Sequence, residues 1–202
     1  MPSDELWLRE GLVLGSVLVY WIGVFLQTFR IRRRIGRSPN VRPRGLKERL
    51  LWLGWTVVVG GWMGQPFLIG RPGIPLVSLI PLLMHPWVMF IGTLMVAGGY
   101  AGTLWCYVAL GDAWRLGIRR HEKTMFVKNG PYRFVRHPIY FLQIVMLIGS
   151  ALLLPTLWSF LLVGVHFFCV CVKAFDEEAY LKRVHGPEYA AYLSKTGRFW
   201  RA

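Results

Sequence analysis

The chain has 202 residues, of which 54% are hydrophobic, and its mean hydropathy is +0.42. A soluble domain of this length rarely needs so much apolar surface, so the composition argues against a soluble protein and favours a membrane protein. The formal net charge is +14, but the basic residues lie in blocks between apolar runs, which favours membrane topology over nucleic-acid binding as their cause.

Apolar runs of roughly 17–25 residues are candidate membrane-spanning helices. In chain order, the first three are residues 11–29, 50–69 and 86–110. The next apolar region, 138–172, is too long for one span, and Pro155 divides it because proline disrupts a helix interior. We therefore expect a helical hairpin over 138–172, with its turn at residues 154–156, and about five spans in all.

Two smaller features modify this picture. The segment 74–84 is apolar but short and contains two prolines, so we expect a re-entrant or interfacial segment there rather than a sixth span. In the third run, Gly98, Gly99 and Gly102 predict a close contact with another helix, because glycine lets two backbones approach.

Charge placement predicts the orientation of the spans. Of the 24 Lys and Arg residues, 22 lie in three segments, 30–49, 111–137 and 173–202. Cytoplasmic segments of membrane proteins carry an excess of Lys and Arg, so we expect the N-terminus outside and the C-terminus in the cytoplasm. Segment 30–49 contains two prolines and is interpreted as a basic loop that contacts lipid head groups.

We interpret residues 1–202 as a single membrane domain with two parts. The N-terminal part, 1–110, holds the first three spans and the basic loop. The C-terminal part, 111–202, holds the hairpin and a cytoplasmic segment, and the two polar clusters of the chain lie in this part.

The first polar cluster is the tract 130–140, Gly-Pro-Tyr-Arg-Phe-Val-Arg-His-Pro-Ile-Tyr, at the start of the fourth span. Pro138 suits the first turn of a helix, which puts His137 at or beside the N-cap. The free N–H groups and the dipole of a helix start favour an anion there. Tyr140 follows His137 by three residues, so both side chains can face one side, although the spacing alone fits an ordinary interfacial helix start equally well.

The second polar cluster follows the fifth apolar run. Lys173 and Glu177 are four residues apart, so they share a helix face and together could hold the two ends of a zwitterion. Taken alone, such a pair is more often a simple surface pair. Because the last two spans form a hairpin, however, His137 and Tyr140 should lie close to Lys173 and Glu177, and this convergence predicts a site for a charged, water-borne ligand.

These motifs carry a resemblance to a known family. The tract 130–140, followed by Glu177-Glu178-x-x-Leu181 and Gly186-x-x-Tyr189-x-x-Tyr192, resembles the isoprenylcysteine carboxyl methyltransferases, which are related to membrane phospholipid methyltransferases. The match covers about residues 110–199. The resemblance implies a methyltransferase embedded in the membrane that uses S-adenosylmethionine.

The resemblance also implies roles for individual residues. The positions that match the family's cofactor-binding positions are Thr124, Met125, Phe126, Val127, Tyr132, His137, Pro138, Ile139, Tyr140 and Glu177. Lys173 stands where the family usually has an arginine for the substrate carboxylate. Arg136 and Glu178 are the candidate catalytic residues, and Glu178 would act as a base only for an amine acceptor, because a carboxylate acceptor needs none. We expect no metal site.

The resulting prediction is an all-α integral membrane protein with its cofactor site at the cytoplasmic face. S-adenosylmethionine would enter from the cytoplasm, and a lipid or lipidated acceptor would enter from the bilayer, with no nucleic-acid partner. The leading hypothesis is O-methylation of an isoprenylcysteine-type carboxylate. The alternatives are a phospholipid amine N-methyltransferase, an NADPH-dependent membrane lipid reductase and a non-enzymatic membrane scaffold. We expect the membrane to be a bacterial or archaeal inner membrane or an ER-type membrane.

Overall fold

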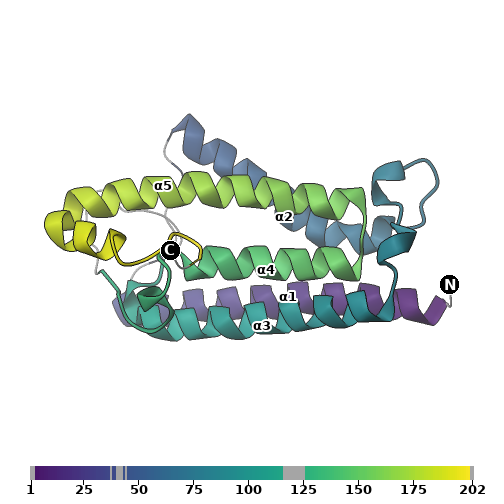
Figure 1. The fold of residues 1–202 in the computed structure, drawn as a ribbon, viewed down its shortest axis with the longest axis horizontal. Helices are drawn as coiled ribbons and strands as arrows, with labels where there is room; N and C mark the ends of the chain where they lie inside the picture. Colours follow the sequence, from purple (N-terminus) through teal and green to yellow (C-terminus); the bar gives the residue numbers. More distant parts are fainter. Residues whose placement is uncertain (1–2, 37, 40–42, 44, 116–125, 201–202) are drawn as a thin grey trace.

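The computed structural model describes residues 3–36, 38–39, 43, 45–115 and 126–200. In this part of the chain, five α-helices lie side by side along one long axis (Figure 1). The helices are α1 (Ser3–Ile35), α2 (Leu46–Leu68), α3 (Pro86–Leu110), α4 (Pro138–Leu153) and α5 (Leu157–Leu193). Four short 3₁₀ turns connect them, η1 (Pro75–Val77), η2 (Pro81–Leu83), η3 (Gly111–Ala113) and η4 (Gly130–Arg133). The all-α prediction is confirmed.

Three of the helices, α1, α3 and α5, are long and apolar enough to cross a membrane. The apolar helix α4 has 16 residues, or about 24 Å of helix, which is less than the hydrocarbon thickness of about 30 Å. Helix α2 has 23 residues and carries charged residues in its first turn. The chain is therefore an integral membrane protein by its helices, while spans at α2 and α4 stay predictions.

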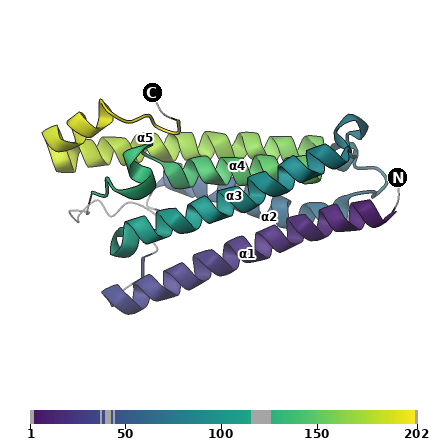
Figure 2. The same cartoon turned by 60° about the horizontal axis from the view of Figure 1, so that its bottom comes forward.

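The two ends of the bundle collect different parts of the chain. One end holds the end of α1, the start of α2, the end of α3 and the C-terminal stretch (Figure 1). The opposite end holds the N-terminus, the connection from α2 to α3, and the turn from α4 to α5, as Figure 2 also shows. The described parts of the three basic segments thus lie together at one end, which we call the basic end, and its cytoplasmic placement stays a prediction.

The predicted hairpin is present, and its turn lies at residues 154–156, between α4 and α5. Thr156 is the N-cap of α5, and its side-chain oxygen accepts a hydrogen bond from the N–H of Ser159 at 3.0 Å. The expected end of the hairpin at residue 172 is wrong, because α5 continues to Leu193. The first strong helix breaker after the apolar run is the pair Gly186-Pro187, where α5 is kinked.

The basic loop expected at residues 30–49 is also corrected. Helix α1 continues to Ile35 and α2 begins at Leu46, so only about ten residues connect them. Arginine has a high helix propensity, which explains why the basic residues after the apolar run extend α1. The helix ends where Gly36 adopts a φ of 70°, a conformation that other residues rarely adopt.

Helices α3 and α4 make the closest contact in the bundle, and small residues allow it. A Cβ atom at Gly99 would lie 2.5 Å from Cγ of Met146, and one at Gly102 would lie 2.7 Å from the side chain of Leu142. The predicted close contact is confirmed at these two glycines. It is wrong for Gly98, which faces open space on the surface of α3.

At the end opposite the basic end, a buried arginine joins three elements. Arg9 of α1 is fully buried, and its guanidinium donates hydrogen bonds to the carbonyl oxygens of Leu153 (3.1 Å) and His85 (3.0 Å) and to Glu5 (2.9 Å). Segment 74–84 forms η1 and η2 rather than a long helix, and the N–H of Ile80 donates to the carbonyl oxygen of Pro155 at 2.8 Å. No sequence motif marks Arg9 as a buried residue.

Candidate functional site

The two predicted polar clusters meet at the basic end, where the start of α4 faces α5. Helix α4 begins at Pro138 with His137 as its N-cap residue, as expected. The hydroxyl of Tyr140 donates a hydrogen bond to Oε1 of Glu177 at 2.8 Å, and Nδ1 of His137 lies 3.6 Å from Oε2. The rings of His137 and Tyr140 are stacked, with centroids 5.5 Å apart. The hairpin therefore brings these three side chains together, and we call them the α4–α5 cluster.

Glu178, the next residue along α5, is held by three basic side chains. Arg198 binds it in a bidentate manner, with nitrogen–oxygen distances of 2.7 and 2.9 Å. Nε of Arg136 donates to Oε1 at 3.0 Å, and Nε2 of His137 lies 3.3 Å from the same oxygen. This ion cluster lies beyond the apolar part of α5, at the end of the bundle.

The surroundings of Glu178 determine its ionisation. Burial by itself raises the pKa of Glu178, but the hydrogen bonds from Arg198 and Arg136 and the nearby His137 imidazole outweigh burial and hold the pKa well below its ordinary value. A carboxylate in this state is a weak proton acceptor at neutral pH. The geometry favours an anchoring role for Glu178 and Arg136 over direct participation in chemistry.

A segment that we call the strap, residues 194–200, closes the cluster from the C-terminal side. The backbone N–H groups of Arg136 and His137 donate to the carbonyl oxygens of Gly197 (2.9 Å) and Arg198 (3.0 Å), and Figure 1 shows this stretch returning to the start of α4. The Arg136 guanidinium also donates to the carbonyl oxygens of Leu193 and Thr196.

Side chains of the strap add to this closure. The guanidinium of Arg198 lies over the ring of Phe175 at 3.7 Å, and Phe199 is buried against Val170 and Ala174. Arg198 and Phe199 lie outside the two polar clusters that predicted the site. The positive charge of Arg198 is visible in the sequence, but the sequence does not indicate that its partner is Glu178.

The remaining predicted cofactor positions lie around this cluster. The N–H groups of Ile139 and Tyr140 precede the first hydrogen bond within α4, which Phe141 donates to the carbonyl oxygen of His137 at 3.1 Å. The intervening Pro138 is buried and has no N–H. The mouth of α4 therefore presents donors that have no acceptor within the helix, the arrangement that suits an anion.

Tyr132 lies in η4, which covers the same end. Burial raises the pKa of Tyr132 well above its usual range, and the nearby groups of Cys106 and Glu177 raise it further, so the phenol stays neutral. The Tyr132 carbonyl oxygen accepts a hydrogen bond from the hydroxyl of Tyr192 at 2.5 Å, which ties η4 to the end of α5.

Phe126 and Val127 begin the last described part of the chain, residues 126–200. The Phe126 ring packs edge to face on Tyr189 and Tyr192, with centroids 5.2 and 4.9 Å apart. Val127 is half-buried in the same segment. The other two predicted cofactor positions, Thr124 and Met125, lie outside the described residues.

Lys173 lies one turn before Glu177 on α5 but does not pair with it. The residue is 9% exposed, and no ion pair or hydrogen bond of its ammonium is found among the described residues. His166, two turns deeper on the same face, is also buried, and its Nε2 has no described hydrogen-bond partner. Unpaired polar groups inside a membrane protein are costly, so these positions are functional candidates.

The fold and this cluster define a helical integral membrane protein with a polar site at one end of its bundle. A family model described as phospholipid methyltransferase matches residues 87–188, just over half of the chain. The chain belongs to the phospholipid methyltransferase family, which is part of the same superfamily of membrane methyltransferases as the isoprenylcysteine carboxyl methyltransferases. The resemblance seen in the sequence is thereby confirmed. No curated protein matches the chain.

The matched region contains α4, η4 and most of α5, and thus every member of the α4–α5 cluster. Arg198 and the strap lie beyond it. Members of this family are membrane methyltransferases and generally use S-adenosylmethionine. The family description does not decide between a phospholipid and an isoprenylcysteine acceptor.

Proposed function

We propose that this protein transfers a methyl group from S-adenosylmethionine to a lipophilic acceptor in the membrane, at the α4–α5 cluster. The observation that carries the proposal is the arrangement of Glu177, which is hydrogen-bonded to Tyr140 and faces His137 beside the open mouth of α4. The cluster lies in the part of the chain that matches the family. Its cytoplasmic placement, inferred from the basic segments, gives a charged cofactor access to it.

The charges of the cofactor fit the groups present in the cluster. Glu177 would hold the ammonium, since its side chain is 24% exposed and pairs with no arginine among the described residues, whereas the neighbouring Glu178 pairs with Arg136 and Arg198. The N–H groups of Ile139 and Tyr140 would hold the carboxylate. The ring of Tyr132 or Tyr140 would face the sulfonium, because aromatic faces attract cations.

The other predicted cofactor contacts are carried by the stretch that includes Phe126 and Val127. The packing of Phe126 on α5 supports this role, because it fixes that stretch beside η4. When bound, the cofactor would supply an activated methyl group to the acceptor, with S-adenosylhomocysteine as the leaving group. The residues of the chain then contribute orientation and exclusion of water.

We favour a carboxylate as the acceptor. A carboxylate needs no base, and the low pKa of Glu178 makes that residue a weak base. Lys173 is a buried cation without a described partner, so it would attract an anionic acceptor group and hold it next to Glu177. Lysine acts as a point charge, so this recognition would lack the bidentate geometry of arginine.

The second candidate is N-methylation of a phospholipid amine, which is compatible with the family description. That reaction releases a proton, and the cluster would have to accept it, with His137 as the remaining ionisable group beside Glu177. The two products differ chemically. A methyl ester is hydrolysed by mild alkali and releases methanol, whereas an N-methyl group is stable under the same conditions.

The proposal is tested first by ligand binding in detergent. We expect S-adenosylhomocysteine to raise the melting temperature and NADPH to leave it unchanged. Glu177→Gln should weaken binding of labelled S-adenosylmethionine by about tenfold or more, as expected for the loss of a charge-assisted contact. The matched control is Asp176→Asn, which removes a neighbouring carboxylate that pairs instead with Lys47.

The binding results also separate the alternatives. Stabilisation by NADPH alone would support a reductase, and stabilisation by neither ligand would support a scaffold. Either of these two outcomes would overturn the proposal. Labelled methyl groups are then followed into membrane lipid extracts, and alkali treatment identifies an ester or an N-methyl product.

A further inference from the structure

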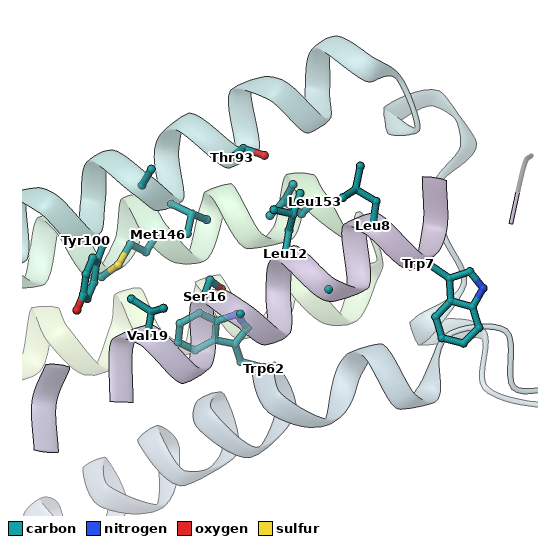
Figure 3. A pocket seen from close by; sticks show the side chains of 14 residues that line it. Trp7, Leu8, Leu12, Ser16, Val19, Trp62, Thr93, Tyr100, Met146 and Leu153 are labelled. Carbon is teal, nitrogen blue, oxygen red and sulfur yellow. The ribbon is translucent and has the colours of Figure 1, made fainter. Parts of the chain in front are cut away.

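The charged groups around the α4–α5 cluster come from the hairpin and from the strap. An apolar groove between α1 and α3 reaches α4 at Met146 and Leu153 (Figure 3), and none of the described residues that line it is charged. The strap, in contrast, places Arg198 on Glu178, directly beside the cluster. Since the family match ends at residue 188, Arg198 is a charged neighbour of the site that the match does not include.

Arg198 contacts both helices of the hairpin. Its side chain pairs with Glu178 of α5 at 2.7 and 2.9 Å and lies over the ring of Phe175 at 3.7 Å. Its carbonyl oxygen accepts a hydrogen bond from the N–H of His137, the N-cap residue of α4, at 3.0 Å. A planar guanidinium that is held by a bidentate carboxylate and an aromatic ring has a defined orientation, which suits it to fix another side chain in place.

Glu178 connects Arg198 to the α4–α5 cluster. Its Oε1 accepts hydrogen bonds from Nε of Arg198 and Nε of Arg136, and Nε2 of His137 lies 3.3 Å from the same oxygen. The imidazole is buried, and its other nitrogen, Nδ1, lies 3.6 Å from Glu177. His137 therefore lies between a carboxylate that two arginines neutralise and one that pairs with no arginine among the described residues.

Loss of Arg198 would change both the orientation and the charge of Glu178. With only Arg136 as its partner, the carboxylate would be freer to rotate away from Nε2 of His137. It would also carry less compensated negative charge beside the mouth of α4, where the carboxylate of the cofactor would bind, and like charges repel. Both changes would weaken cofactor binding while every group that contacts the cofactor is still present.

We propose that Arg198 is a positioning residue for the cofactor site, which holds and neutralises Glu178 and thereby keeps His137 and Glu177 arranged for S-adenosylmethionine. The inference rests on the proposed function and adds to it a residue that acts through Glu178 instead of by contact with the cofactor. It also gives the two adjacent glutamates different roles, because Glu177 would bind the cofactor and Glu178 would transmit the effect of the strap.

The test is a double-mutant cycle of Arg198→Met and Glu178→Gln, measured as the Kd of labelled S-adenosylmethionine in detergent. We expect Arg198→Met to raise Kd about tenfold in the wild-type background. In the Glu178→Gln background, the same substitution should change Kd by less than about twofold, because the carboxylate through which Arg198 acts is absent. The matched control is Arg34→Met, which removes an exposed arginine that pairs with Asp112 at the same end of the bundle.

A conservative variant separates positioning from a general structural role. Arg198→Lys keeps a positive charge near Glu178 but loses the bidentate contact, so it should raise Kd only about threefold. The same cycle is run with Arg198→Lys if Arg198→Met does not fold. Melting temperatures without ligand are measured for every variant, so that Kd is compared only among folded proteins.

The outcomes are distinguishable. Equal weakening by Arg198→Met in both backgrounds would show that Arg198 acts independently of Glu178 and would overturn the inference. An unchanged Kd in folded Arg198→Met would also overturn it, while the proposed function would stand. Absence of binding to the wild-type protein would reject the proposed function, and this inference with it.

Discussion

Both ends of the helix bundle contain arginine side chains in polar networks, fully buried at one end and half-buried at the other, and the two networks differ. At the N-terminal end, the described hydrogen bonds of Arg9 go to the Glu5 carboxylate and to backbone carbonyl oxygens at residues 85, 152 and 153. At the basic end, Arg136 and Arg198 neutralise one carboxylate, while in the described part of the chain no arginine pairs with the neighbouring Glu177 and Lys173 has no partner.

This difference separates stability from function. A saturated polar network can stabilise a bundle, since each buried polar group has its hydrogen bonds. A network that keeps an unneutralised charge and unused hydrogen-bond donors stabilises the protein less by itself. Binding of a charged ligand then increases the stability of the protein. We therefore expect substitutions at the N-terminal end to affect folding. At the basic end, we expect some substitutions to affect stability and others to affect ligand binding.

The largest effect is expected for Arg9→Leu. The substitution leaves Glu5 and the carbonyl oxygens of Leu153 and His85 without their donor, which should lower the free energy of unfolding by about 3–5 kcal/mol. Thermal unfolding in detergent measures the change, and Arg71→Leu is the control because Arg71 is exposed at the same end. Affinity of the folded fraction for S-adenosylmethionine should stay unchanged; a selective loss of affinity would break the proposed division.

The next largest effect is expected for Glu178→Gln, which leaves Arg136 and Arg198 without a counter-charge. We expect a loss of about 2–3 kcal/mol, against about 0–1 kcal/mol for Glu188→Gln, which removes an exposed partner of Lys128. Urea or thermal unfolding of both variants compares the two carboxylates. Equal losses would show that burial of Glu178 and its contacts with two arginines do not increase the free energy of unfolding beyond that of an exposed ion pair.

The stabilising contribution of Glu178 should also depend on pH. Its pKa in the folded protein lies below the ordinary value of 4.5, so the contribution is fully present above that value and is lost as pH falls toward the folded pKa. The difference in melting temperature between wild type and Glu178→Gln should be constant from about pH 7.5 to 5.5 and shrink below about pH 4.5. A difference that grows on acidification would contradict the assigned ionisation.

A smaller effect, on binding alone, is expected for Lys173→Met. Loss of the buried cation should raise KM for a carboxylate acceptor about tenfold, while KM for S-adenosylmethionine is unchanged. Stability should change little, because the Lys173 ammonium makes no described hydrogen bond or ion pair and is not among the fully buried unpaired atoms. Lys173→Arg keeps the charge and is the control. An amine acceptor would instead bind as well or better to Lys173→Met.

The smallest effect is expected for Tyr140→Phe, which removes the hydrogen bond to Glu177 and keeps the ring stacked on His137. One hydrogen bond of this kind corresponds to about a three- to tenfold weaker binding of S-adenosylmethionine. Labelled-ligand binding measures the change, with Tyr180→Phe as a control elsewhere on α5. Unchanged affinity would show that this hydroxyl does not orient the Glu177 carboxylate for the cofactor.

Local signals in the sequence predicted much of this site. Pro138 and Pro155 mark a helix start and a turn through backbone geometry that proline imposes, and both predictions are confirmed. Once the hairpin is placed, the approach of Tyr140 to Glu177 follows from its connectivity. Which of these residues bind the cofactor and the acceptor stays a prediction.

The parts that sequence reasoning missed depend on long-range pairing or on the surroundings of a helix. Arg9 and Arg198 are ordinary basic residues in the sequence, and only the packed bundle shows which acceptors surround them. Gly98 and Gly99 are equivalent as letters, but one faces open space and the other faces α4. The ends of α1 and α5 extend past their apolar runs because charged residues with high helix propensity continue the helix.

The strap has a consequence for how such proteins diverge. Arg136 and His137 bond to main-chain oxygens of residues 193–198, and every amino acid supplies the same oxygen. We therefore expect substitutions at most of these positions to leave these hydrogen bonds intact. A family model detects residue identities, and hydrogen bonds to backbone oxygens do not require particular residues. The family match ends at residue 188, before the strap begins.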